Sequence, residues 1–126
     1  MKNVRILIGM AIFFIAATIG LKGAVQPLEG KWTGEFKGTA GTVPFCVHFW
    51  MENDEMMGTI DFPAENLIGL KLSWIMIDST AVHFEVVKGA QTLAFNGTLI
   101  SNQLAGEFTT KSARGVFGLS RTLGTL

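Results

Sequence analysis

The chain has 126 residues, which is a typical length for a single domain. Ten basic and ten acidic residues give a formal net charge of zero, whereas nucleic-acid-binding proteins carry a basic excess. Hydrophobic residues make up 48% of the chain, and this content excludes the class of disordered chains. A single cysteine excludes an intrachain disulfide and a zinc site made of cysteines alone.

The N-terminal residues have the layout of a secretory signal peptide. Lys2 and Arg5 supply positive charge, residues 6–21 contain no charged side chain, and small residues follow. Export machinery recognises this order, and a peptidase cuts after small side chains. We therefore expect a signal peptide helix at 1–24, cut at about 20–24, and a domain at 28–126 that is extracytoplasmic (periplasmic or secreted). If the segment is not cleaved, it is the expected contact with a membrane.

The remainder of the chain reads as short strands joined by turns. Apolar runs of about eight residues alternate with turn signals, a rhythm typical of an all-β sandwich or barrel. In 43–51, for example, apolar side chains at every second position mark one buried face. Residues 63–69 are expected to form a bend or one helical turn. The expected strands are 31–39, 43–51, 56–62, 70–77, 81–87, 91–100, 103–110 and 113–121.

Four glycines recur at the same position within these strands, in an apolar-x-Gly-Thr/Glu-apolar pattern: Gly34, Gly58, Gly97 and Gly106. Glycine weakens a strand, so a repeated glycine needs a structural reason. Barrels bend their strands at such positions. The pattern therefore predicts a single antiparallel up-and-down barrel of about eight strands.

The first and last expected strands carry residues that could close the barrel. In a closed meander the first and last strands are neighbours, which would bring Arg121 to Trp32. A guanidinium stacked on an indole contributes about 0.5–2 kcal/mol. Gly30, Trp32 and Arg121 resemble the Gly-x-Trp triplet and terminal arginine of lipocalin-like (calycin-like) barrels, and that resemblance implies a structural role in closure.

A wider resemblance covers nearly the whole chain after the leader. The chain is similar to the small β-barrel that precedes the catalytic domain in many secreted bacterial α/β-hydrolases of the esterase and serine-peptidase type. The matching segments are Leu28–Phe36, Gly58–Pro63, Phe84–Val86, Phe95–Leu99, Leu104–Phe108 and Leu119–Arg121. The chain ends shortly after the last of these, so the hydrolase domain is expected to be absent.

No catalytic machinery is expected in this chain. A hydrolase nucleophile requires Gly-x-Ser-x-Gly, and none of the five serines has both glycines; Ser120 comes nearest. The two histidines, His48 and His83, lie on strands that nothing in the spacing brings together. We therefore predict a protein that is not an enzyme, with no metal and no cofactor.

Two functions remain open at this point. The first is a non-catalytic extracytoplasmic barrel that binds a small hydrophobic ligand or a partner protein, and the second is an accessory domain of a hydrolase. Aromatic content fits both a ligand pocket in the barrel and an interior filled by its own rings. The candidate interior ligand-binding residues are Trp32, Phe36, Phe45, Phe49, Trp74, Phe84, Phe95 and Phe108.

Overall fold

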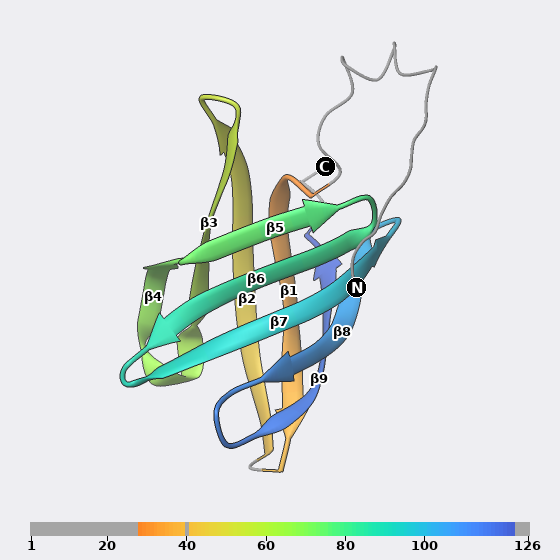
Figure 1. The fold of residues 1–126 in the computed structure, drawn as a ribbon. Helices are drawn as coiled ribbons and strands as arrows, with labels where there is room; N and C mark the ends of the chain where they lie inside the picture. The colour runs from red at the N-terminus through yellow and green to blue at the C-terminus, as the bar shows by residue number, and fades with distance from the viewer. Residues whose placement is uncertain (1–27, 40, 123–126) are drawn as a thin grey trace.

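The computed structural model describes residues 28–39 and 41–122, so the predicted signal peptide lies outside the described residues. Nine strands form one antiparallel sheet (Figure 1). The described ranges contain no helix that is long and apolar enough to cross a membrane. The strands are β1 (Gly30–Gly38), β2 (Gly41–Glu52), β3 (Glu55–Phe62), β4 (Leu67–Lys71), β5 (Trp74–Asp78), β6 (Ala81–Lys88), β7 (Gln91–Ile100), β8 (Gln103–Thr109) and β9 (Arg114–Arg121).

The sheet is an up-and-down meander that rolls into a barrel. Its strand order is β4-β3-β2-β1-β9-β8-β7-β6-β5, so the first and last strands pair in the middle of the sheet. Trp32 lies opposite Arg121, and Gly38 lies opposite Gly115. The prediction of an all-β antiparallel barrel is confirmed.

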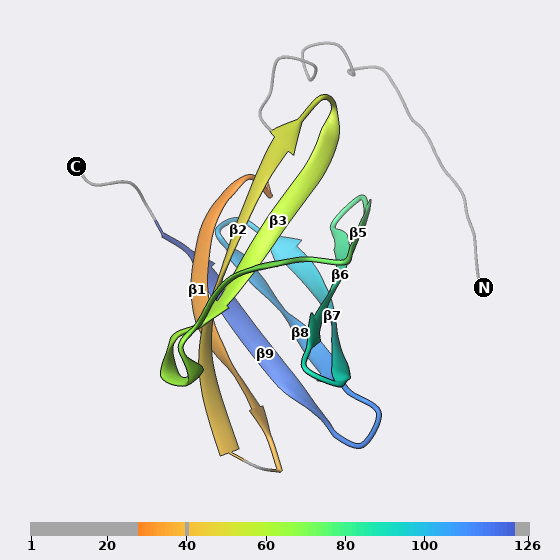
Figure 2. The ribbon, with the colours of Figure 1, turned by 90° about the vertical axis from the view of Figure 1, so that its left-hand side faces the viewer.

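The ninth strand arises because the predicted strand 70–77 is divided between β4 and β5. The Leu72 N–H donates to Gly58 O on β3 (2.9 Å), and the next N–H, from Ser73, donates to Glu85 O on β6 (2.8 Å). Within two residues the chain thus leaves one edge of the sheet and joins the other, as Figure 2 shows. We call this point the crossing.

The predicted turn at 63–69 contains a short 3-10 helix at Pro63–Glu65 (η2). Asn66 ends it in a left-handed conformation (φ 57°). The Gly69 N–H then donates to Asp61 Oδ1 at 2.7 Å, which fixes the return of the chain into β4.

Two of the in-strand glycines allow adjacent strands to approach closely. A Cβ on Gly34 would lie 1.8 Å from Gly118 O on β9, and one on Gly106 would lie 1.9 Å from Asn96 O on β7. Both distances are far shorter than any real contact of a Cβ atom. These positions therefore accept glycine alone without a backbone shift.

The barrel interior is packed with aromatic rings. Phe84 and Phe95 stack with centroids 4.7 Å apart, and Phe36 lies 4.5 Å from Phe108. Such pairs contribute beyond the area that they bury. The buried core consists of Leu28, Trp32, Phe36, Phe45, Val47, Phe49, Ile60, Phe62, Val82, Phe84, Val86, Leu93, Phe95, Leu104, Phe108, Phe117 and Leu119.

Candidate binding cleft

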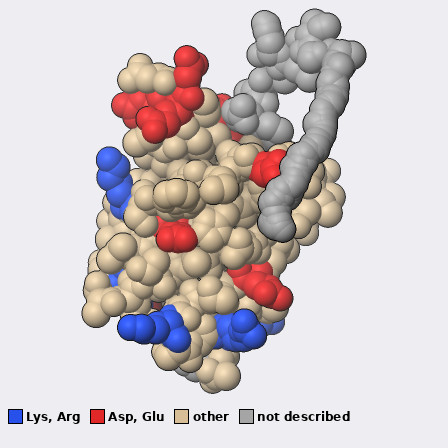
Figure 3. Space-filling model, in the orientation of Figure 1, with Lys and Arg blue, Asp and Glu red and all other residues tan. Residues whose placement is uncertain are grey.

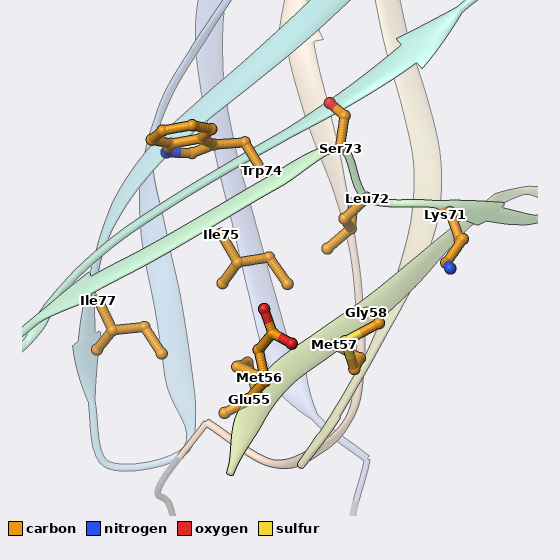
Figure 4. Close-up of a pocket in the computed structure, with 10 residues that line it drawn as sticks. All are labelled: Glu55, Met56, Met57, Gly58, Lys71, Leu72, Ser73, Trp74, Ile75 and Ile77. Atoms are coloured by element: carbon orange, nitrogen blue, oxygen red, sulfur yellow. The ribbon is translucent and has the colours of Figure 1, made fainter. Parts of the chain in front are cut away.

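A cleft of about 470 Å³ opens in the wall of the barrel between β3 and β5 (Figure 4). Two smaller cavities lie elsewhere on the barrel. One of about 260 Å³ lies on the outer face of β1–β3, and one of about 220 Å³ lies at the barrel end near Glu65. The residues that line it are Glu55, Met56, Met57, Gly58, Lys71, Leu72, Ser73, Trp74, Ile75 and Ile77.

The cleft exists because two strand edges face each other without pairing. Within the described residues, β5 pairs only with β6, and residues 55–57 of β3 pair only with β2. In Figure 2, β3 and β5 lie on the two sides of the molecule that the crossing connects. The backbone of both edges is therefore available from the cleft.

The hairpin turns identify which backbone groups these are. Two-residue turns connect the partners Glu52 and Glu55, and the partners Asp78 and Ala81. A pair that closes a two-residue turn exchanges its hydrogen bonds, and the direction of the backbone groups alternates along each strand. The N–H and C=O groups of Met56 on β3, and of Ile75 and Ile77 on β5, therefore point away from their paired strands and toward the cleft.

Apolar side chains form the floor and rim of the cleft. Met56, Leu72 and Ile75 are partly buried and pack against the barrel core. Leu72 lies over Gly58, where an added Cβ would come within 2.6 Å of Leu72 Cδ1. Trp74 on the rim is 52% exposed. Met side chains adapt to irregular shapes, which suits a variable occupant.

The two ends of the cleft carry opposite charges. The Glu55 carboxylate points from β3 toward Ile75 in Figure 4, and Lys71 lies at the crossing. Glu52 and Asp54 add acidic groups at the β2–β3 turn, where Figure 3 shows red side chains gathered. The cleft therefore has acidic side chains at its end near the β2–β3 turn and the basic Lys71 at its end near the crossing.

The two edges of the sheet face each other along a line that we call the seam. On the other side of the crossing, side chains close this seam. Lys88 Nζ lies 2.8 Å from Glu65 Oε1 and 5.5 Å from the centre of the Phe62 ring. The cation joins η2 to the end of β6 and covers a core ring. The cleft between β3 and β5 therefore lies on the side of the crossing away from this ion pair.

Seven of the eight predicted interior ligand residues are buried within the core: Trp32, Phe36, Phe45, Phe49, Phe84, Phe95 and Phe108. The six Phe rings pack mostly against one another and against neighbouring Phe side chains. Phe36 and Phe108 also reach the cavity at the barrel end, and Trp32 reaches the one on the outer face of β1–β3. None of the seven lines the cleft.

The expectation that Trp74 faces the interior is wrong. Ile75 lies opposite Phe84, a core residue, so Trp74 beside it points outward, opposite Glu85. The inward positions before the bend are Leu70 and Leu72, so the alternation slips by one residue at the crossing. A single strand through 70–77 would keep Trp74 inside.

The two histidines lie on separate strands. On the outer face of β6, His83 Nδ1 lies 2.6 Å from Asn96 Oδ1 and Nε2 lies 2.6 Å from Glu85 Oε2. Both ring nitrogens are therefore engaged. His48 on β2 contacts Trp50, with centroids 5.0 Å apart. No group of three potential metal ligands occurs among the described residues.

The barrel closure has the geometry of a stacked cation. The Arg121 guanidinium carbon lies 4.5 Å from the centre of the Trp32 ring. Its nitrogens bond to Asn102 Oδ1 (3.0 Å) and to the Glu29 carbonyl. Gly30 has a φ of +126°, and a Cβ there would lie 2.9 Å from Arg121 Nη1, so this position leaves room for the arginine.

The comparisons with known proteins bear on the fold. No family model and no curated protein matches the chain. Among solved structures, the chain is similar to a redesigned β-barrel, mFAP1, bound to DFHBI, with 18% identity and a TM-score of 0.52 over 77% of this chain and 96% of that one. The likeness extends to the fold alone. The chain has the fold of a small β-barrel.

Proposed function

We propose that this protein is a non-catalytic extracytoplasmic binding module, and that the cleft between β3 and β5 holds a small hydrophobic ligand. One observation carries the proposal: a cleft of about 470 Å³ with a mostly apolar lining opens beside the buried aromatic core. This volume falls within the range of about 300–1,000 Å³ that is typical of ligand sites. The barrel neighbour is itself bound to DFHBI, which is compatible with a binding role for this fold.

The chemistry of the cleft supports binding rather than catalysis. Ser73 is the only hydroxyl-bearing residue among those that line it, and Ser73 Oγ donates to Glu85 O at 3.3 Å. A serine nucleophile needs an adjacent base that is oriented by a third group. Neither histidine lines the cleft.

The extracytoplasmic location rests on the leader-like sequence at 1–24. The accessory-domain hypothesis predicts a second partner, a hydrolase domain supplied by another chain. Co-purification with a hydrolase that is encoded beside this gene would support that alternative.

A titration with lauric acid tests the proposed function. We expect saturable binding by isothermal calorimetry, and we expect Ile77→Glu to weaken it at least about tenfold, because a charge enters the apolar wall. Val116→Glu is the matched control, because Val116 is 55% exposed on β9 and does not line the cleft. Equal affinity in both variants would overturn the proposal, as would the absence of saturable binding of both lauric acid and an apolar peptide to the unmodified protein.

A further inference from the structure

We propose that the occupant of the cleft is a short, extended apolar peptide of three or four residues with free ends, held as an added strand along β5. This inference rests on the proposed function, because it names the class of hydrophobic ligand that the same cleft takes. Three features of the cleft carry it: the strand edges, the apolar walls and the charges at the two ends.

The unpaired backbone groups of the strand edges favour a ligand with a peptide backbone. Met56 on one side, and Ile75 and Ile77 on the other, direct N–H and C=O groups toward the cleft, as the registers of the two hairpins require. An acyl chain would cover these groups without bonding to them, and a polar group buried without a partner is destabilising. An extended peptide supplies alternating donors and acceptors at the same spacing, as in recognition by strand addition.

The apolar walls of the cleft favour apolar side chains on the peptide. A peptide strand directs alternate side chains to opposite faces. Toward the core, these side chains would meet Met56, Leu72 and Ile75, which are partly buried. On the outer side they would lie beside Trp74 and Met57, which also line the cleft. Branched apolar residues such as Leu and Val fit both surfaces.

The charges at the ends set the length and direction. Glu55 lies at the open tip, and Lys71 lies opposite Thr59, four residues further along β3. Four residues of strand span about 13 Å, which matches a tripeptide or tetrapeptide. A free amino group near Glu55 and a free carboxylate near Lys71 would pair with both charges. The peptide would then run antiparallel to β5.

The first test compares ligands on the unmodified protein by isothermal calorimetry. We expect the free tripeptide Leu-Val-Leu to bind, and we expect N-methylation of its second or third residue to weaken binding about tenfold in at least one of the two derivatives, the scale of one lost hydrogen bond. Acetylation and amidation of the ends should weaken binding by about fivefold, because both charge pairs are lost. Equal affinity for the free and both N-methylated peptides would overturn strand pairing.

The second test changes the edge of β5. Ile77→Pro removes one N–H that faces the cleft, while it leaves the ladder to β6 and an apolar side chain in place; proline is tolerated at such edge positions. Ile77→Val is the matched control that keeps the N–H. We expect the proline variant to lose peptide affinity about tenfold and to keep lauric acid affinity within about twofold. If Ile77→Pro does not fold, as a thermal melt would reveal, the N-methylated peptides decide the question.

The outcomes separate this inference from the proposed function. Binding of lauric acid without binding of Leu-Val-Leu would overturn the peptide inference and leave the binding function in place. The absence of binding by both ligands would overturn both. Binding that requires a longer peptide with blocked ends would indicate a segment of a partner protein and would overturn the free-ended ligand.

Discussion

The guanidinium carbon of Arg121 lies 4.5 Å from the ring centre of Trp32, at the junction where β9 pairs with β1. The indole is fully buried, and its Nε1 donates to Leu28 O at 2.9 Å. A residue near the end of the domain thus covers a core side chain near its beginning. This contact joins the two halves of the meander, because β1 and β9 are its central pair.

Removal of either partner should weaken the barrel. Trp32→Ala deletes a large buried aromatic side chain and should lower the free energy of unfolding by about 3–5 kcal/mol. Arg121→Lys should lower it by about 1 kcal/mol, because an ammonium group cannot stack as a planar guanidinium does. Urea melts measure both values.

A double-mutant cycle isolates the contact from the other bonds of Arg121. Trp32→Ala, Arg121→Ala and the double variant should give a coupling of about 0.5–2 kcal/mol. The hydrogen bonds from Arg121 to Glu29 and Asn102 are lost in the presence and in the absence of Trp32, so they cancel in the cycle. A coupling of zero would mean that the ring and the cation do not interact.

The close approach of neighbouring strands makes a second prediction. In Gly106→Ala, the added Cβ would meet Asn96 O at 1.9 Å, and the backbone must shift. We expect a loss of about 1–3 kcal/mol in the free energy of unfolding, the usual cost of overpacking. Gly118→Ala is the matched control on β9, because a Cβ there meets nothing within 4 Å. Equal losses in the two variants would contradict the close approach.

The ion pair between Lys88 and Glu65 leads to a third prediction. Lys88→Met keeps the apolar stem over Phe62 but removes the charge that contacts Glu65. Both side chains are partly exposed, so we expect a loss of only about 0.5–1 kcal/mol. The difference between variant and parent should shrink in high salt, because salt screens exposed pairs. A difference that is unchanged between low and high salt would place the contribution of Lys88 in packing.

The closure was predictable from the sequence, whereas the cleft was not. Eight strands joined by short turns bring the two ends of a meander together, so Trp32 and Arg121 become neighbours by topology alone. The cleft depends on the crossing at Leu72–Ser73, where hydrogen bonding passes from β3 to β6. Hydrogen bonding leaves no mark in an apolar pattern, and 70–77 is apolar almost throughout.

The structure shows where the period of two breaks in that segment. Leu70, Leu72 and Ile75 pack against the core, whereas Trp74 is 52% exposed, so the inward step from Leu72 to Ile75 is three residues. The sequence does not mark this step, because Trp74 and Met76 are as apolar as their neighbours. The side that Trp74 faces follows from this slip. The filled interior, in contrast, depends on how rings from different strands interlock, which no single segment encodes.

The exposed tryptophan of the cleft makes the last prediction. Trp74 is 52% exposed and stands on the rim, so an apolar ligand should remove water from its indole and shift its fluorescence to shorter wavelength. Trp32 is already fully buried, and Trp50, although paired with Met57, does not line the cleft, so we expect the shift to come from Trp74. We expect Trp74→Phe to abolish the shift that lauric acid or Leu-Val-Leu produces, with affinity reduced by less than about fivefold, because Phe retains most of the apolar contact. Trp50→Phe is the matched control and should leave the shift unchanged. If Trp50→Phe abolishes the shift instead, the ligand binds on the outer face of β2, and the cleft between β3 and β5 is not the site.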